Sequence, residues 1–549
     1  MKADILIRNA RIFTADRNNP QSSALAVKDG KFVYVGDEAG LSAYEGEVTD
    51  LSGKFIMPAI LDTHVHVTSS IGFEYADLGV RFECDGKQEA LRFMADYIKE
   101  NPGLPRYRFM MEQKYLKGEL LTKDDLDSIC PDRELVVLEG ECHSNWVNSK
   151  VLEKHGITDE TPDPVPGLSY FVRVDGHVTG NTFESASWPF LFDGLELNDE
   201  KIEGPLGRLI DYCVNTGVNV LFDAGFPEHE KIHERVYQQL RKMDLEGRLP
   251  IYIDGCYMLT NPQKTKTALE ELQRFNREFN TEHMKVHTLK ILMDGTQKIH
   301  TAAMVTPYAD TGELGCTTFD AKGLADVLKQ LNEMGMDLHL HTVGERASRT
   351  ALDGVELARK ELGDAFRVKV TCAHLEIQDD ADMDRFAKLG VIANFTPWWH
   401  AGDPATTASW LGEERSKKLF RCKTIWDSGA LVTWSSDCVA YADFMKWNPY
   451  LGMEVGMTRI RTEKTRIAEY DRTAAVLPPE NERMGIEEML LGYTINGAKM
   501  LGIEAQKGSI EAGKDADFLV FDKDLLTAEH DGFSQNLPED VFICGRKVN

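Results

Sequence analysis

The chain alternates short apolar runs with longer polar or amphipathic segments, and this rhythm constrains its fold more than any other feature. The eight runs cover residues 55–67, 218–224, 251–256, 289–293, 336–341, 368–374, 391–396 and 430–435. Each resembles a buried strand, while segments such as 324–334 and 345–362 have helical periodicity. Any single run is also compatible with a buried helix. Eight strand–helix units in succession nevertheless predict an α/β fold with a TIM (β/α)8 barrel, whose functional groups lie at the carboxyl ends of the strands.

The two ends of the chain are rich in predicted β-strands. Residues 1–55 alternate apolar and polar side chains around the turn pair Asp29-Gly30, and residues 503–549 also contain short apolar runs separated by glycines. Because termini often lie close together, we expect both ends to form one composite N-/C-terminal β-sandwich, with two separate edge hairpins as the alternative. Residues 56–69 with 204–502 then form the barrel. Residues 70–203 are too long for one loop and predict an inserted α+β domain, after the first barrel strand and over the barrel mouth.

Composition excludes several classes of partner. The chain has 62 Lys+Arg against 89 Asp+Glu, a formal net charge of -27. Such an acidic surface repels nucleic acid and anionic lipid, so we expect neither as a partner. No apolar run approaches the roughly 18 residues that a membrane span requires. The ten cysteines are scattered without a C-x-x-C pair, which favours reduced thiols and a cytoplasmic location.

Histidines gather at the ends of the predicted strands. His64 and His66 close the first run, and the i, i+2 spacing of a strand points both rings to the same face. His339 and His341 end another run, and His374 ends the next. Neutral imidazole is the commonest protein ligand for zinc, although each histidine alone could be structural.

A carboxylate and a lysine extend this group. Asp437 follows the last predicted strand, so its position together with the histidines predicts a metal site. Lys290 interrupts the apolar run 289–293. Burial favours the neutral amine of a lysine, which can capture carbon dioxide as a carbamate able to bridge two cations. The alternatives for Lys290 are a pair with Asp294 or a path to solvent.

Further motifs accompany these residues along the chain. They are 57–66 (MPAILDTHVH), 143–149 (HSNWVNS), 221–225 (LFDAG), 289–295 (LKILMDG), 341–347 (HTVGERA), 436–437 (SD), 493–498 (YTINGA) and 508–517 (GSIEAGKDAD). Together they resemble the amidohydrolase superfamily, and most closely its amidohydrolase family three branch of N-substituted formamide deformylase-like, metal-dependent hydrolases. The resemblance runs almost end to end.

The resemblance implies a ligand for each strand position of the family's metal site. The implied ligands are His64, His66, Lys290, His341, His374 and Asp437. The implied cofactor is Zn2+, as one or two ions, with other divalent metals as alternatives. A carbamate derived from CO2 on Lys290 is implied as well. His339 has no ligand counterpart in the family, so we expect it to be a wall or supporting residue.

The resemblance also implies a reaction. It is hydrolysis of a non-peptide C–N bond in an amide, N-formyl or N-acyl group by a metal-activated water. Asp437 is the expected proton shuttle. His143, in the inserted segment, is expected to contact the substrate and stabilise tetrahedral charge, with a local hydrogen bond as its alternative role. The expected partner is a small-molecule amide substrate, and a homodimer is an option.

Four other residues are candidates for substrate binding. Trp398 and Trp399 follow the seventh run and could line an apolar pocket or brace the barrel mouth. Tyr308 and Arg346 could bind a polar group of the substrate. Glu345 departs from the family pattern, which usually has Asp at this position, so whatever that residue supports could be shifted.

Other activities share this scaffold. A deaminase of the superfamily usually lacks the lysine on the fourth strand, so Lys290 argues against that class. An isomerase or a decarboxylase could use the same metal ligands. A non-catalytic regulator on the same barrel would be expected to lose ligands, and none is missing from the sequence.

Overall fold

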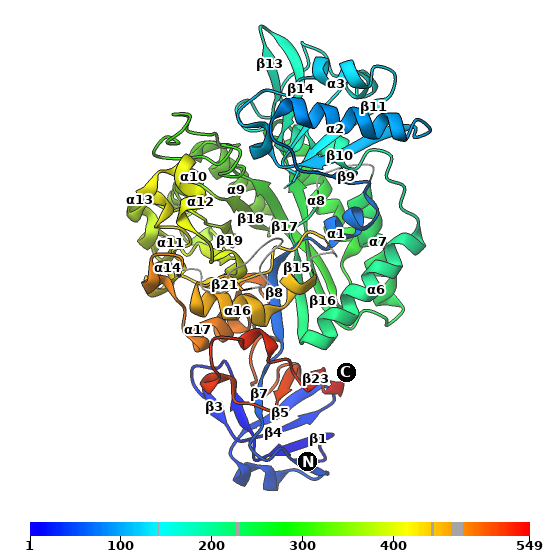
Figure 1. The fold of residues 1–549 in the computed structure, drawn as a ribbon. Coiled ribbons are helices and arrows are strands. Elements are labelled where there is room, and N and C mark those ends of the chain that lie inside the picture. Colours follow the sequence, from blue (N-terminus) through cyan, green and yellow to red (C-terminus); the bar gives the residue numbers. More distant parts are fainter. Residues whose placement is uncertain (141, 227–230, 441–443, 463–475) are drawn as a thin grey trace.

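The computed structural model describes residues 1–140, 142–226, 231–440, 444–462 and 476–549. Figure 1 shows three parts in a stack: a β-sandwich that holds both termini, a barrel in the middle, and an α+β part beyond the opposite end of the barrel. None of the helices in the described ranges is long and apolar enough to cross a bilayer.

An eight-stranded parallel sheet forms the middle part. In spatial order its strands are β8 (Ile60–Val65), β15 (Val218–Asp223), β16 (Tyr252–Leu259), β17 (Met284–Leu292), β18 (Asp337–Thr342), β19 (Val370–His374), β20 (Ile392–Phe395) and β21 (Val432–Trp434). The edge strands β8 and β21 meet where the hydroxyl of Thr63 donates to the carbonyl of Trp434 over 2.8 Å. Just beyond, the N–H of Asp437 donates to the carbonyl of His64 over 2.8 Å. The sheet is therefore a nearly closed barrel, which confirms the predicted fold class.

Helices follow the barrel strands and cover the outside of the sheet (Figure 1). They include α6 (Asp199–Thr216), α7 (Ile232–Leu245), α8 (Thr265–Phe279), α9 (Ala321–Met334), α10 (Glu345–Leu362), α11 (Met383–Leu389), α14 (Cys422–Asp427), α17 (Ile486–Gly492) and α18 (Ile495–Leu501). Helix α9 shows how the sequence sets such bounds. The side chain of Asp320 accepts from the N–H of Gly323 at its start, and Gly335 takes the left-handed conformation at its end.

The first apolar run, 55–67, differs from its prediction as one barrel strand. It forms two strands, β7 (Phe55–Pro58) and β8, separated by Ala59. The N–H of Ala59 donates to Asp517 in the sandwich, whereas the N–H of Ile60 donates to Gly217 at the base of the barrel. The chain thus passes from the sandwich to the barrel between these two residues. The sequence does not reveal this passage, because both strands are buried and together form one continuous apolar run.

Strands from both ends of the chain share the sandwich. One sheet has the order β5 (Lys31–Gly36), β4 (Ala24–Lys28), β1 (Ile5–Arg8) and β6 (Val48–Asp50). The other has the order β24 (Arg546–Lys547), β23 (Asp540–Ile543), β22 (Phe518–Phe521), β7, β2 (Arg11–Phe13) and β3 (Gln21–Ser22). Because β22 pairs antiparallel with β7, the C-terminal segment completes a sheet that the N-terminal segment begins.

The inserted segment contains a six-stranded sheet beside helices α2 (Lys87–Glu100), α3 (Lys123–Ile129) and α4 (Ser149–Lys154). The strand order is β13 (Phe171–Val174), β14 (His177–Phe183), β12 (Ser144–Val147), β11 (Glu134–Glu139), β10 (Arg106–Met111) and β9 (Val80–Arg81). Helix α1 (Val67–Tyr75) leads from β8 towards this part. The sheet lies over the end of the barrel that is away from the sandwich (Figure 1), so its loops reach the same end as the carboxyl termini of the barrel strands.

Phe518 gives a test of the composite sandwich. Its side chain is fully buried, with its ring centroid 5.9 Å from that of Phe32 and 4.4 Å from that of Phe542. We expect Phe518→Ala to lower the free energy of unfolding by about 3–5 kcal/mol, because it leaves a cavity between strands of both chain ends. Thermal and urea unfolding measure the change. Leu537→Ala, at a side chain that is 50% exposed, is the control. Equal unfolding midpoints for the two variants would contradict the joint core.

Candidate metal centre

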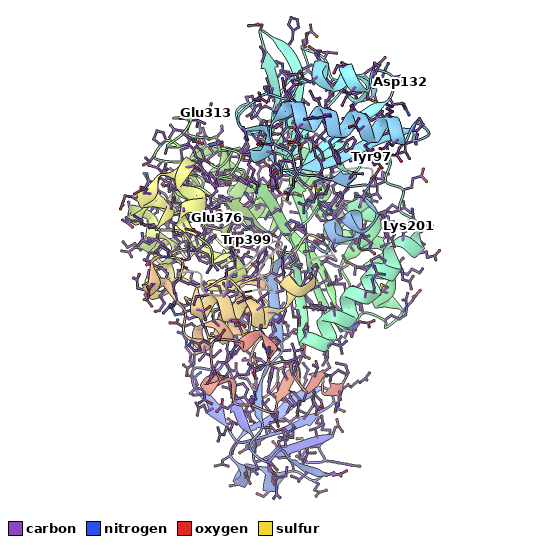
Figure 2. All side chains as sticks on the ribbon, in the orientation of Figure 1. Tyr97, Asp132, Lys201, Glu313, Glu376 and Trp399 are labelled. Carbon is purple, nitrogen blue, oxygen red and sulfur yellow. The ribbon has the colours of Figure 1, made fainter. Side chains whose placement is uncertain are left out.

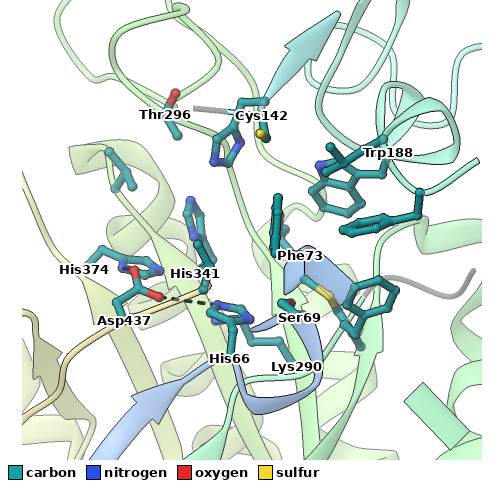
Figure 3. A pocket seen from close by; sticks show the side chains of 18 of the residues that line it. His66, Ser69, Phe73, Cys142, Trp188, Lys290, Thr296, His341, His374 and Asp437 are labelled. Atoms are coloured by element: carbon teal, nitrogen blue, oxygen red, sulfur yellow. Dashed lines mark ion pairs between the residues drawn. The ribbon is translucent and has the colours of Figure 1, made fainter. Parts of the chain in front are cut away.

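The residues with predicted metal roles lie together at the mouth of the barrel. His64 is in β8, Lys290 in β17 and His341 in β18, and His374 is the last residue of β19. Parallel strands bring their carboxyl ends to one side of the sheet. Figure 3 shows five of the predicted ligands around one space: His66, Lys290, His341, His374 and Asp437.

The carboxylate of Asp437 stands at the centre of this group. Its Oδ1 lies 3.4 Å from Nε2 of His64 and 3.4 Å from Nε2 of His66, and its Oδ2 lies 3.4 Å from Nδ1 of His374. Within the described ranges, His64, His66 and Asp437 are the one set of three His, Cys, Asp or Glu residues whose ligand atoms all lie within 4.8 Å of one another. Such a set of imidazoles around a carboxylate has the donor chemistry of a divalent cation site.

Lys290 lies inside the barrel beside these ligands. Its side chain is buried, and its Nζ is 3.4 Å from Nε2 of His64. Burial lowers the pKa of Lys290 to about 8. Asp294, the alternative partner, accepts instead from the backbone N–H groups of Ala303, Val343 and Gly344. The structure therefore places Lys290 at the group of ligands and not at Asp294 or in solvent.

Outer hydrogen bonds orient the imidazole rings. Nδ1 of His66 donates to the carbonyl of Gly225 over 2.9 Å, and Nε2 of His341 donates to the carbonyl of Gly295 over 3.3 Å. In a neutral ring the other nitrogen of each then has a free lone pair. Such contacts to carbonyl groups are typical of histidines that hold metals.

Burial keeps the deeper imidazoles neutral. It lowers the pKa of His64, His341 and His374 well below the usual value of histidine. His339 is also buried, and its Nε2 lies 2.9 Å from Nδ1 of His64. His339 therefore contacts a predicted ligand from behind instead of facing the cavity. Neutral imidazole is the form that binds a cation, so the residues present fit a divalent metal.

The backbone at the mouth of the barrel is unusual where ligands stand. His374 has φ of 75° and Asp437 has φ of 47°, both in the left-handed region that side chains other than glycine rarely adopt. Asp62 supports the turn at Asp437, since its Oδ1 accepts from the N–H of Ser436 over 3.0 Å and from that of His64 over 3.3 Å. Burial raises the pKa of Asp62 to about 7. Strain of this kind is common at functional sites.

A cavity opens directly above the ligands, and its walls are mainly apolar. The aromatic and aliphatic lining comprises Phe73, Trp188, Leu191, Phe192, Phe226, Met258, Leu292, Val343, Trp399 and Val439. Polar groups come from the predicted ligands other than His64, and from Ser69, Cys142, His143, Thr296 and Glu376. Sequence reasoning missed most of these wall residues, although the aromatic cluster Phe183, Trp188, Phe190 and Phe192 within the insertion was a visible signal.

Of the four residues predicted to bind substrate, the structure places one on this cavity. Trp399 lines it and stacks on His374, with ring centroids 5.5 Å apart. Figure 2 shows Trp399 and Glu376 in the middle part of the molecule, which is the barrel. Trp398 lines an adjoining groove instead, and its Nε1 donates to the carbonyl of Ser436 over 2.5 Å.

Tyr308 and Arg346 lie away from the cavity, and their contacts do not support the prediction that they bind substrate. The hydroxyl of Tyr308 is buried and donates to the carbonyl of Ala302 over 3.0 Å. Arg346 donates to the carbonyls of Leu314 and Gly315 over 3.1 and 2.5 Å. Both residues hold loops together, and a sequence pattern does not distinguish such a role from substrate binding.

His143 reaches the cavity from the insertion. It is part of the cavity lining, and its Nδ1 lies 2.8 Å from Oε2 of Glu184.

Glu345, the departure from the family pattern, begins α10 and accepts from the N–H of Val305 over 3.1 Å. Glu345 therefore supports a neighbouring loop and is not part of the cavity lining.

Comparison with known sequences and structures finds relatives that match most of the chain. Over 95% of the chain, it is 25% identical to the N-substituted formamide deformylase of Arthrobacter pascens, covering 94% of that protein. It is also 25% identical, over 72% of the chain and 86% of the relative, to the exoenzymes regulatory protein AepA of Pectobacterium carotovorum subsp. carotovorum. Among solved structures, an uncharacterized metal-dependent hydrolase from Pyrococcus horikoshii matches with a TM-score of 0.65. The match covers 96% of this chain and 99% of that one at 21% identity, and it shows a shared fold.

The sequence model of the amidohydrolase family matches residues 47–548. This range runs from the sandwich through the barrel and back to the sandwich. This range contains every residue of the metal centre described above. The chain belongs to the amidohydrolase family.

Proposed function

We propose that the protein is a zinc-dependent amidohydrolase that hydrolyses a non-peptide amide, an N-formyl or N-acyl amine of small size. The family supports metal-dependent hydrolase activity in general. The observation that carries the finer proposal is the placement of His64, His66, His374 and Lys290 around the carboxylate of Asp437, directly below an apolar cavity.

The donor set suits zinc in particular. Imidazole nitrogens and carboxylate oxygens are its usual ligands, and His64, His66, His341, His374 and Asp437 would hold one or two ions. A carbamate on Lys290 would supply a further anionic oxygen ligand next to His64. Burial favours the neutral amine that this reaction with carbon dioxide requires. When bound, the cation lowers the pKa of water towards neutrality and polarises a carbonyl group.

The side chains of the chain itself have distinct roles in the proposed reaction. The apolar cavity holds the hydrocarbon part of the substrate and excludes bulk water, which strengthens every charge interaction inside it. Asp437 accepts a proton from the attacking water and passes it to the leaving nitrogen as the C–N bond breaks. His143 lies on the cavity wall, where it can donate a hydrogen bond to the carbonyl oxygen as negative charge develops there.

A non-catalytic regulator is the second candidate, because one relative carries the name of a regulatory protein. The complete set of donors and the open cavity above it favour catalysis. Zinc-loaded protein should release amine from at least one member of a panel of N-formyl and N-acetyl derivatives of alkylamines and arylamines. Metal-free protein should release none. Failure of the metal-loaded protein on every substrate, cyclic amides included, would refute the proposal.

Removal of two ligands tests the metal site directly. We expect His64→Ala with His66→Ala to reduce bound zinc to background, because both residues face Asp437 from the same strand end. Elemental analysis of the purified protein measures the loss, and circular dichroism checks that the fold persists. His177→Ala, at an exposed histidine in the insertion, should retain full metal content. Normal zinc content in the double variant would contradict the assignment.

The modification of Lys290 has its own test. Metal-free protein in 13C-bicarbonate should show a carbamate carbonyl signal by NMR that Lys290→Met lacks. Because the pKa of Lys290 is lowered to about 8, the neutral amine becomes more abundant as pH rises through this value. The signal should therefore grow between about pH 7 and about pH 9. An unmodified amine in metal-replete protein at high resolution, with a single metal bound, would show that Lys290 is not a bridge.

Asp437→Asn tests the proton shuttle. Asparagine has nearly the same size but cannot accept the proton, so turnover of the best amide should fall by roughly 100-fold or more. Zinc content must be measured in parallel, since Asp437 also contacts the ligand group. Asp310→Asn, which removes an outlying carboxylate that pairs with His300, is the matched control. Near-normal turnover with unchanged zinc would show that the proton goes elsewhere.

A further inference from the structure

A buried carboxylate in the insertion, Glu184, holds the imidazole of His143 at the rim of the cavity. Nδ1 of His143 lies 2.8 Å from Oε2 of Glu184, and the backbone N–H of Glu184 donates to the carbonyl of His143 over 2.7 Å. The side chain of Glu184 is 3% exposed, whereas that of His143 is 27% exposed. One edge of the ring is thus fixed inside the protein while His143 still lines the cavity.

The barrel fixes the same carboxylate from the other side. Oε1 of Glu184 accepts from the hydroxyl of Thr301 over 2.7 Å, and Thr301 lies in the segment between β17 and α9. Gly295 makes room for this contact, because a Cβ at that position would lie 2.2 Å from Oε1 of Glu184. The same glycine offers its carbonyl to His341. The Asp294-Gly295 motif therefore serves both the metal centre and the contact with the insertion.

The backbone of Glu184 is itself strained. Its φ is 50°, in the left-handed region that costs a residue with a Cβ about 1–2 kcal/mol. Glycine would avoid this cost, so the side chain at this position must contribute something that offsets it. Non-glycine residues in such conformations gather at functional sites, which makes Glu184 a candidate for a functional role.

The charge of Glu184 determines what His143 can do. With a proton on each nitrogen, the ring donates from Nδ1 to Glu184 and presents Nε2–H as a donor. A buried carboxylate at hydrogen-bond distance stabilises this doubly protonated form, as in a His–Asp pair of a hydrolase. Other titratable groups nearby are Tyr170 and Asp294 beside Glu184, and Cys142, His66, Lys290, His341, His374, Glu376 and Asp437 on the cavity lining.

We propose that Glu184 is the positioning residue that keeps His143 doubly protonated over the cavity, so that Nε2–H donates to the substrate's carbonyl oxygen as charge develops. This rests on the proposed function, since it needs a carbonyl group held above Asp437. The ring keeps both protons throughout, and no covalent bond to it forms. The insertion thereby contributes electrostatic stabilisation to a reaction whose other groups come from the barrel.

Glu184→Gln is the central test, because glutamine keeps the size of the side chain and loses its charge. On the fastest substrate among N-formyl and N-acetyl alkylamines, kcat should fall about 10- to 100-fold while KM and zinc content stay unchanged, as expected for a contact made only in the transition state. Thr301→Val should give a smaller loss of kcat, because it removes the anchor on the barrel side.

The insertion offers a matched control. Nδ1 of His177 lies 2.8 Å from Oδ2 of Asp159, the same separation as in the His143–Glu184 pair, but both side chains are exposed. Asp159→Asn should leave kcat and KM unchanged. A rise in KM with constant kcat in Glu184→Gln, or equal effects of Glu184→Gln and Asp159→Asn, would overturn the proposal and leave Glu184 a structural residue.

A second measurement does not depend on activity. In protein labelled with 15N-histidine, His143 should show two ring N–H signals near neutral pH, assigned by their loss in His143→Asn. In Glu184→Gln one of the two should disappear. Two unchanged signals in that variant would overturn the positioning role. If the wild-type protein hydrolyses no amide, the proposed function fails, and the NMR result alone decides whether Glu184 controls the protonation of His143.

Discussion

Closure of the barrel between its first and last strands is the constraint on which the rest of the structure depends. The N–H of Asp437 donates to the carbonyl of His64, and the N–H of His66 donates to the carbonyl of Cys438. These bonds join β8 to the segment after β21 at the positions of three predicted ligands. The hydrogen bonds that close the sheet therefore also hold these predicted ligands together. Asp62 reinforces the closure by accepting from the N–H groups of His64 and Ser436, one on each side of it.

The candidate metal centre places several ionisable side chains in the interior of the barrel, where removing their charged forms from water costs free energy. Desolvation penalises charge, so the imidazoles of His64, His341 and His374 are held neutral, and the pKa of Asp294 is raised to about 8. Asp294 still accepts three backbone hydrogen bonds, which order the loops after β17 and β18. A cation bound at Asp437 would offset much of the desolvation cost of these buried groups, because its positive charge would attract the carboxylate and the imidazole lone pairs.

The cavity belongs to two parts of the molecule. The barrel contributes the ligands and walls such as Met258 and Leu292, and the insertion contributes Trp188, Leu191 and Phe192 together with His143. The hydrogen bond from Thr301 to Glu184 connects the two parts at the cavity rim, and Glu184 in turn accepts from His143 within the insertion. Substrate selectivity in the proposed reaction would therefore depend on the insertion, whereas the chemistry would depend mainly on the barrel.

The sequence by itself determined the barrel class and the places of the predicted ligands at strand ends, because both follow from local patterns. Strand length and apolar character identify parallel strands, and His64, His66, His341, His374 and Asp437 stand at the ends of such runs. Only the tertiary structure decided the change of partners at Ala59, the bond of His339 to His64, the positions of Tyr308 and Arg346 away from the cavity, and the contacts of Glu184 with His143 and Thr301. Apart from the bond of Tyr308 to Ala302, these depend on contacts between residues far apart in the chain. A local pattern predicts which face of its strand a side chain occupies. The residue that it contacts depends on how strands and loops pack in three dimensions.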